Sequence, residues 1–179
     1  GWGNTYMFNV STVCTWDGDV GTVYIDKAVD GLLKPNVIVK SLSTLKFDLD
    51  EHHANDGVLL GHNLIGFDLP VLKNAMDIFC IGKYLDDKAY IDTSMILNKA
   101  YGERYSLNNL AQHTLGTEKL MDSADAPVVW KAGDYASVAE YCLDDCKLVF
   151  DLWKSGQENK IVKGFSLEEE EIKELEVEW

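Results

Sequence analysis

The sequence contains no long apolar run, few cysteines and no cysteine pair of metal-binding spacing. No stretch approaches the roughly 18 uninterrupted apolar residues of a membrane span, and no signal peptide is visible, so we expect no membrane association. The 4 cysteines form no CxxC pair, which argues against a structural zinc site and against a disulfide-rich secreted fold. A reducing, intracellular compartment (cytoplasm, nucleoid or nucleus) is therefore expected.

Basic side chains are also scarce. The chain has 16 Lys and Arg against 30 Asp and Glu, a formal net charge of −14. Proteins that hold nucleic acid through its phosphates tend to carry a basic patch, so this charge argues against a large, tight nucleic-acid surface. Sites for divalent cations are acidic, however, and nucleic acid is not excluded. Part of the excess lies in 161–179, an expected acidic C-terminal extension that either closes with a strand at 175–179 or is a solvated tail.

The chain is long enough for one domain with a substantial core, and we assign residues 1–160 to it. Apolar periodicity and turn residues predict strands over 6–13, 20–25, 58–61 and 90–92, strand or mixed structure over 37–47, and helices over 68–78, 106–115 and 135–154. This alternation predicts an α/β sheet covered by helices. A start at Gly1 without methionine is compatible with an excised domain of a larger parent protein or with added residues.

The predicted helix over 135–154 carries a carboxylate within its apolar stripe. The stripe follows three- and four-residue steps and consists of Val138, Tyr141, Cys142, Asp145, Leu148, Val149 and Leu152. A carboxylate in that position is costly unless a cation or hydrogen-bond donors meet it, so Asp145 needs either a Lys, Arg or backbone partner or a metal ion. Tyr141 lies one turn earlier, and its hydroxyl can reach the same place as the Asp145 carboxylate.

A second motif follows the predicted strand over 58–61. The strand ends in Gly61, a tight loop follows, and Asp68 opens a helix that tolerates Pro70 in its first turn. Taken alone, Asp68 is a helix N-cap. Its position at the carboxyl end of a strand is also where α/β sheets place their sites.

Together these motifs resemble the DEDDy type of DnaQ-like 3′–5′ exonucleases. Asn63-x-x-x-Phe67-Asp68-x-Pro70 resembles the second exonuclease motif, and Tyr141-x-x-x-Asp145 resembles the third in its tyrosine-bearing form. Between them, the segments 90–93 and 105–116 look like the connecting region of RNase D and of polymerase proofreading domains. The resemblance covers roughly residues 5–155 and implies an RNase H-like fold, a mixed sheet flanked by helices.

The resemblance also implies a chemistry. In that family four carboxylates hold two divalent ions, usually Mg²⁺ or Mn²⁺, which activate a water for phosphodiester hydrolysis. Carried over, Asp68 and Asp145 are metal ligands and Tyr141 orients the water, which makes these three the candidate catalytic residues. Thr12, Asn63 and Phe67 are the candidate contacts to nucleic acid, and the substrate is the 3′ end of single-stranded DNA or RNA.

The first motif of the family, Asp-x-Glu-Thr, is degenerate in this chain. The sequence has Phe8-Asn9-Val10-Ser11-Thr12, and the predicted strand places Asn9 and Ser11 on one face, at the two carboxylate positions. Hard cations prefer anionic oxygen ligands, whereas Asn9 and Ser11 offer neutral ones. We therefore expect weakened or absent binding of Mg²⁺ or Mn²⁺, and little or no hydrolysis, as in a pseudoenzyme.

Three hypotheses stay open. The first is a degenerate exonuclease domain that keeps the fold and weak single-strand binding. The second is an active exonuclease, either with an atypical site or disabled by engineered residues at Asn9 and Ser11. The third is a non-catalytic structural or protein-interaction module that reuses the scaffold and contacts a protein partner through its acidic extension. The first two require Asn9, Ser11, Asp68, Tyr141 and Asp145 to converge on one pocket.

Overall fold

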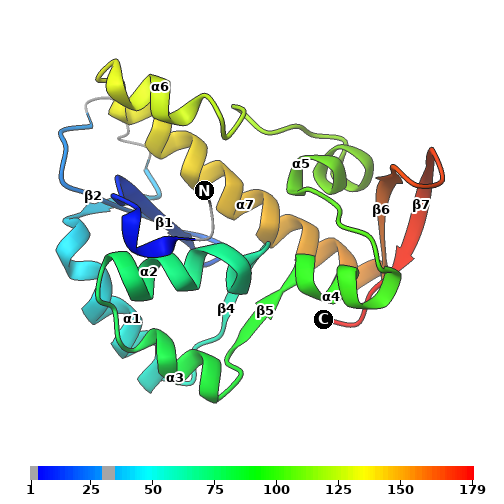
Figure 1. Cartoon of the computed structure of the whole chain (residues 1–179), viewed down its shortest axis with the longest axis horizontal. Helices are drawn as coiled ribbons and strands as arrows, with labels where there is room; N and C mark the ends of the chain where they lie inside the picture. Colours follow the sequence, from blue (N-terminus) through cyan, green and yellow to red (C-terminus); the bar gives the residue numbers. More distant parts are fainter. Residues whose placement is uncertain (1–3, 30–34) are drawn as a thin grey trace. The chain divides into compact units, whose positions relative to one another are not determined.

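The computed structural model describes residues 4–29 and 35–179, which form a mixed α/β structure (Figure 1). The predicted α/β class is therefore confirmed. The strands of the described residues lie in three small sheets, ordered β1-β2-β3, β4-β5 and β6-β7. The chain divides into two compact units. Unit 1 comprises Gly1–Val10, Lys46–Glu118 and Val149–Trp179, and unit 2 comprises Ser11–Leu45 and Lys119–Leu148.

Unit 2 contains the three-stranded sheet and the first part of the longest helix. Its elements are β1 (Thr12–Trp16), β2 (Gly21–Ile25), β3 (Val37–Lys40), the 3₁₀ turn η2 (Leu42–Thr44), α6 (Ala126–Lys131) and α7 (Tyr135–Asn159) as far as Leu148. Strand β2 pairs antiparallel with β1 and parallel with β3. The exposed Asp134 starts α7 as predicted, because its carboxylate accepts a hydrogen bond from the N–H of Ser137 at 3.1 Å.

The core of unit 2 lies between this sheet and α7. It consists of Cys14, Val23, Ile25, Ala139 and Leu143. The strand β2 approaches the helix closely at Gly21, where a Cβ atom would lie 2.8 Å from Cδ1 of Leu143. A larger residue at this position would force the leucine to move, so glycine permits the contact.

Unit 1 contains the other two sheets and most of the helices. Its elements are η1 (Thr5–Met7), α1 (Leu45–Ala54, from Lys46 on), β4 (Leu59–Gly61), the π-helical turn η3 (Leu64–Asp68), α2 (Leu69–Ala75), α3 (Ile81–Asp86), β5 (Tyr90–Asp92), α4 (Thr93–Tyr101), α5 (Leu107–Leu110), the π-helical turn η4 (Ala111–Leu115), the end of α7, β6 (Ile161–Ser166) and β7 (Glu171–Glu176). Strands β4 and β5 are parallel, with Gly61 opposite Asp92. In the described part of the chain, no helix combines the length and apolar character of a membrane span.

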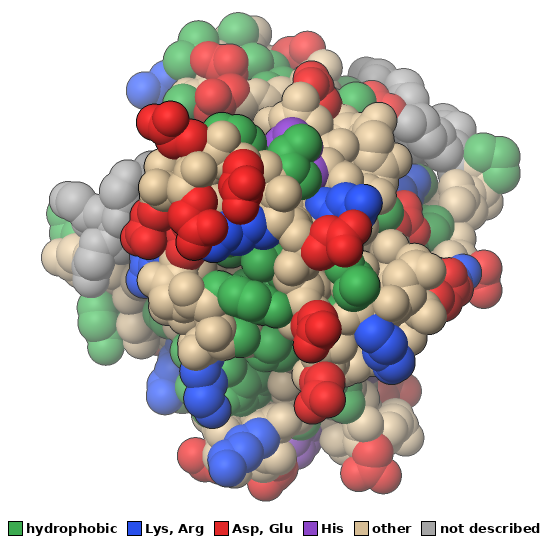
Figure 2. Space-filling model, turned by 90° about the vertical axis from the view of Figure 1, so that its right-hand side faces the viewer, with side chains coloured by type: hydrophobic (Ala, Val, Ile, Leu, Met, Phe, Trp, Pro, Cys, Tyr) green, Lys and Arg blue, Asp and Glu red, His purple; other side chains and the backbone are tan. Residues whose placement is uncertain are grey.

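The C-terminal extension folds as an antiparallel hairpin of β6 and β7. Side chains of α5 and η4 bond the outer edge of β6: the Asn109 amide pairs with N and O of Phe165 at 2.7 and 2.8 Å, and the Thr114 hydroxyl pairs with N and O of Lys163 at 2.8 and 2.9 Å. These two side chains take the place of a neighbouring strand. Figure 2 shows acidic and apolar side chains mixed on the face that carries this hairpin. The second strand starts earlier than predicted, at Glu171, and the alternative of a solvated tail is wrong.

Three other predicted boundaries are wrong. The helix predicted over 68–78 ends at Ala75. The strand predicted over 6–13 begins only at Thr12, because Thr5–Met7 forms a 3₁₀ turn. The long helix continues past Ser155 and Gly156 to Asn159. A Cβ atom at Gly156 would lie 2.5 Å from the ring of Trp179. This glycine therefore lies within the helix, where its missing side chain leaves room for the ring of Trp179.

Candidate active site

The third motif lies on α7 in unit 2, where Tyr141 and Asp145 share a partner. Nζ of Lys119 lies 2.6 Å from Oδ2 of Asp145 and donates a hydrogen bond to the Tyr141 hydroxyl at 3.2 Å. The ammonium also lies 5.2 Å from the centroid of the tyrosine ring. The carboxylate and the hydroxyl thus meet at one nitrogen atom, as their spacing of one helical turn predicts.

The electrostatics of this cluster follow from its burial. Burial raises the pKa of Asp145, and hydrogen bonds from Lys119 and Tyr141 oppose that rise. Burial works to lower the pKa of Lys119, but the contacts with Asp145 and Tyr141 outweigh it and leave the pKa raised. The pKa of Tyr141 is raised by burial and then by the charge of Asp145. The amine is therefore an ammonium and the tyrosine a neutral phenol at neutral pH.

As it lies, the Asp145 carboxylate does not fit a divalent cation. Its Oδ2 is occupied by the ammonium of Lys119, and its Oδ1 is buried and accepts no hydrogen bond from any residue that the structure describes. Within either unit, the described residues include no group of three or more His, Cys, Asp or Glu side chains arranged to hold a metal ion. Mg²⁺ prefers near-octahedral oxygen ligation, which one carboxylate and one phenol do not supply. The partner of Asp145 in this structure is a lysine.

The second motif forms a tight loop in unit 1 between β4 and α2. Asn63 has a left-handed backbone (φ 65°), which asparagine tolerates better than most residues. The missing side chain of Gly66 makes room for Asn63, since a Cβ atom there would lie 2.3 Å from the Asn63 Oδ1. Asp68 is exposed and directly precedes α2, but its carboxylate makes no capping hydrogen bond to the helix. The predicted N-cap role of Asp68 is wrong, because η3 already supplies a helical turn before α2.

A histidine fixes the start of this loop. Nε2 of His62 lies 2.9 Å from the carbonyl oxygen of Tyr105, and its Nδ1 lies 2.9 Å from the hydroxyl of Thr93. A carbonyl only accepts, so Nε2 carries a proton. The hydroxyl of Thr93 also donates to the carbonyl oxygen of Gly61 at 3.2 Å. The pairing joins the loop to the first residue of α4 and to the segment that precedes α5. The periodicity of apolar residues in the sequence does not predict these contacts of His62.

Only Thr12 of the first motif lies on a strand. Asn9 is exposed in unit 1, and Ser11 is half-buried in unit 2, and both precede β1. The period of two that placed them on one face therefore does not apply to them. Thr12 opens β1, and its hydroxyl donates to the carbonyl of Tyr24 across the sheet at 3.1 Å.

The predicted site residues divide between the two units. Asn9, Asn63, Phe67 and Asp68 belong to unit 1, where the ring of Phe67 packs edge-to-face on Phe8 with centroids 5.3 Å apart. Ser11, Thr12, Tyr141 and Asp145 belong to unit 2. The structure brings together Tyr141 and Asp145 in one unit and the loop residues in the other. The convergence of both groups on one pocket stays a prediction.

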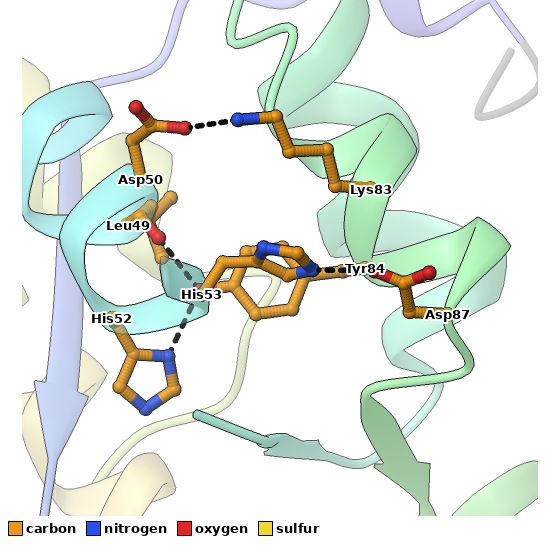
Figure 3. Close-up of polar contacts among 7 residues, drawn as sticks. All are labelled: Leu49, Asp50, His52, His53, Lys83, Tyr84 and Asp87. Carbon is orange, nitrogen blue, oxygen red and sulfur yellow. Dashed lines mark hydrogen bonds and ion pairs between the residues drawn. The ribbon is translucent and has the colours of Figure 1, made fainter. Parts of the chain in front are cut away.

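A second polar cluster, not predicted from the sequence, joins α1 to α3 in unit 1 (Figure 3). The fully buried Tyr84 donates its hydroxyl proton to the carbonyl of Leu49 at 2.7 Å and lies 2.8 Å from Nδ1 of His52. Burial raises the pKa of Tyr84 to about 12. Nε2 of His53 lies 3.0 Å from the carboxylate of Asp87. Because each pair bridges the two helices, we assign this cluster to packing.

Lys119 is the site residue that the sequence did not single out. It lies in an irregular segment between η4 and α6, far from Asp145 in sequence, and no periodicity links the two. The requirement for a cationic or hydrogen-bonding partner was visible, but the identity of that partner was not. No protein-family model matches the chain, and a search of curated proteins finds no significant match, so its geometry and chemistry carry the functional argument.

Proposed function

We propose that the chain is an RNase H-like domain derived from the DEDDy 3′–5′ exonucleases, which holds the 3′ end of single-stranded DNA or RNA without cutting it. The observation that carries the proposal is the meeting of Tyr141 and Asp145 at one nitrogen atom, Nζ of Lys119. A tyrosine that orients water beside a metal-bound carboxylate needs this proximity. The ammonium removes the cation-binding capacity while it preserves the arrangement.

The loop of unit 1 supports a role in holding the strand. Asn63 and Asp68 are exposed, and Phe67 is half-buried on the ring of Phe8. An aromatic ring fixed in this way offers a stacking surface for a base, and such stacking does not depend on the base sequence of the strand. The net charge of −14 makes phosphate contacts few, so we expect weak binding that depends little on salt.

Fluorescence anisotropy with 5′-labelled single strands whose 3′ ends are free or blocked, in EDTA, tests the binding. We expect binding in the micromolar range or weaker that is reduced by a 3′ block and by Phe67→Leu, which keeps apolar volume but loses the stacking face. Phe79→Leu is the matched control, since Phe79 is a 79 % exposed ring of the same unit outside the loop. A chain that binds no single strand would favour a protein-interaction module and contradict the proposal.

A trimming assay with a 3′-labelled strand in Mn²⁺ tests whether the chain hydrolyses phosphodiester bonds. We expect the chain to leave the strand intact. The double substitution Asn9→Asp, Ser11→Glu restores the two carboxylates of the first motif and tests their assignment. Robust trimming by the unaltered chain would show that its metal ligands are other than the ones assigned.

A further inference from the structure

We infer that Lys119 is a built-in counter-ion of the third motif, which occupies the carboxylate of Asp145 and keeps divalent cations from it. The inference rests on the proposed function in one respect, since it takes Asp145 as the motif carboxylate. It adds the reason why this carboxylate does not bind a divalent cation, and it names Lys119 as the residue responsible.

The ammonium is held by more than one contact. It bonds to Oδ2 of Asp145 and to the hydroxyl of Tyr141, side chains on successive turns of α7, and it faces the tyrosine ring. The side chains of Lys119 and Asp145 are only 19 % and 24 % exposed. An ion pair shielded from water in this way is stronger than an exposed one, because solvent screens it less. Lys119 is therefore a fixed part of the site.

A divalent ion bound to Oδ2 of Asp145 would lie close to the ammonium of Lys119, and the two positive charges repel each other. Mg²⁺ binds carboxylate oxygens at about 2.0–2.1 Å, closer than the nitrogen now lies to Oδ2 of Asp145. The other oxygen, Oδ1, is buried. Mg²⁺ usually keeps several of its waters, so a buried oxygen offers it no open approach. Metal binding at Asp145 is therefore opposed by Lys119 as long as its ammonium stays in place.

The residues of the first motif also disfavour the binding of divalent cations. Asn9 and Ser11 supply no negative charge where the family has two carboxylates. A cation site that loses anionic ligands binds divalent ions more weakly, and a resident ammonium weakens it further. The neutral side chains of Asn9 and Ser11 and the ammonium of Lys119 are separate features of the chain, and each disfavours a divalent ion.

Mn²⁺ binding, measured from the electron paramagnetic resonance signal of free Mn²⁺ without any nucleic acid, tests the inference. Lys119→Met keeps the length of the side chain and removes its charge. We expect this variant to gain at least about tenfold in Mn²⁺ affinity, because a nearby positive charge is gone. The gain should vanish in the double variant Lys119→Met, Asp145→Asn. Lys131→Met, at an exposed lysine of the same unit, is the matched control and should resemble the unaltered chain.

The comparison of the unaltered chain with Asp145→Asn decides the question even if Lys119→Met does not fold. Equal Mn²⁺ affinity in these two proteins is the expected result. A loss of affinity in Asp145→Asn would show that the carboxylate binds metal with Lys119 present, and a folded Lys119→Met without any gain would equally overturn the inference. Failure of single-strand binding would contradict the proposed function but not this inference, since the Mn²⁺ experiment contains no nucleic acid.

Discussion

The carboxylate of Asp92 accepts a hydrogen bond from the backbone N–H of Asn63 at 2.9 Å. Asp92 ends β5, and Asn63 lies in the loop that follows the neighbouring strand β4. It also accepts from the N–H of Ile65 at 2.9 Å and, as the cap of α4, from that of Met95 at 3.1 Å. Asp92 is 1 % exposed. The loop that carries Asn63 and Asp68 is therefore held by a residue outside its own motif.

Asp92→Asn is expected to destabilise the fold by about 2–3 kcal/mol, because hydrogen bonds to a charged acceptor are strong and the amide would turn its NH₂ group toward an N–H donor. The measurement is the free energy of urea unfolding. Asp134→Asn is the matched control at the exposed cap of α7, where asparagine caps as well as aspartate, and little change is expected. Equal stability of Asp92→Asn and the unaltered chain would contradict the assigned hydrogen bonds.

Tyr84→Phe is expected to cost about 1–2 kcal/mol, since it leaves the carbonyl of Leu49 without its donor in a buried place and removes the partner of His52. Urea unfolding measures this loss. Tyr101→Phe removes a hydroxyl that bonds the carbonyl of Glu176 on the surface, so it should cost less. If both variants lost the same stability, the buried hydroxyl would have no special role.

The stability of the chain should fall as the pH drops below the ordinary pKa of histidine, 6.5, in part because of His52. Burial and then the nearby His53 lower the pKa of His52, so the unfolded chain binds a proton at a higher pH than the folded chain. The stability that His52 supplies is complete above pH 6.5, and it is lost as the pH falls from 6.5 to the lowered pKa of the folded chain. Asp50, whose pKa is lowered by Lys83, supplies stability above pH 3.8 that is lost only as the pH falls below that value, so it does not contribute to this change.

His52→Gln should therefore show a smaller change of melting temperature than the unaltered chain between about pH 7.5 and about pH 5.5. His113→Gln, at a histidine outside the cluster, is the control. An unchanged pH dependence in His52→Gln would exclude His52 as the source.

The sequence predicted the elements with strong local signals, but it did not predict the helices α1, α3, α4 and α6 or the strand β6. Ser106 and Asp134 begin their helices with side-chain hydrogen bonds, as expected of caps. Some errors came from contacts over long distances in the chain, and others from local turns. Gly156 continues a helix because the ring of Trp179 packs on it, and Asp68 is no cap because a helical turn precedes it.

The candidate site was predictable in part for the same reason. Tyr141 and Asp145 are one turn apart, so periodicity alone placed the hydroxyl and the carboxylate together. Lys119 reaches them through an irregular segment, for which no period exists. Asn9 and Ser11 were assigned by assuming a strand that starts later in the structure, so their role depends on the substitution experiments.

The central claim is that Lys119 and Asp145 form a coupled ion pair that leaves the third motif neutral. A double-mutant cycle of Lys119→Met and Asp145→Asn, read by urea unfolding in EDTA, measures this coupling directly. We expect about 1–2 kcal/mol of favourable coupling, as for partly buried partners in contact, and less for the exposed pair Lys163 and Glu174, which lie 3.0 Å apart. Additive effects of the two substitutions at the site would contradict the account.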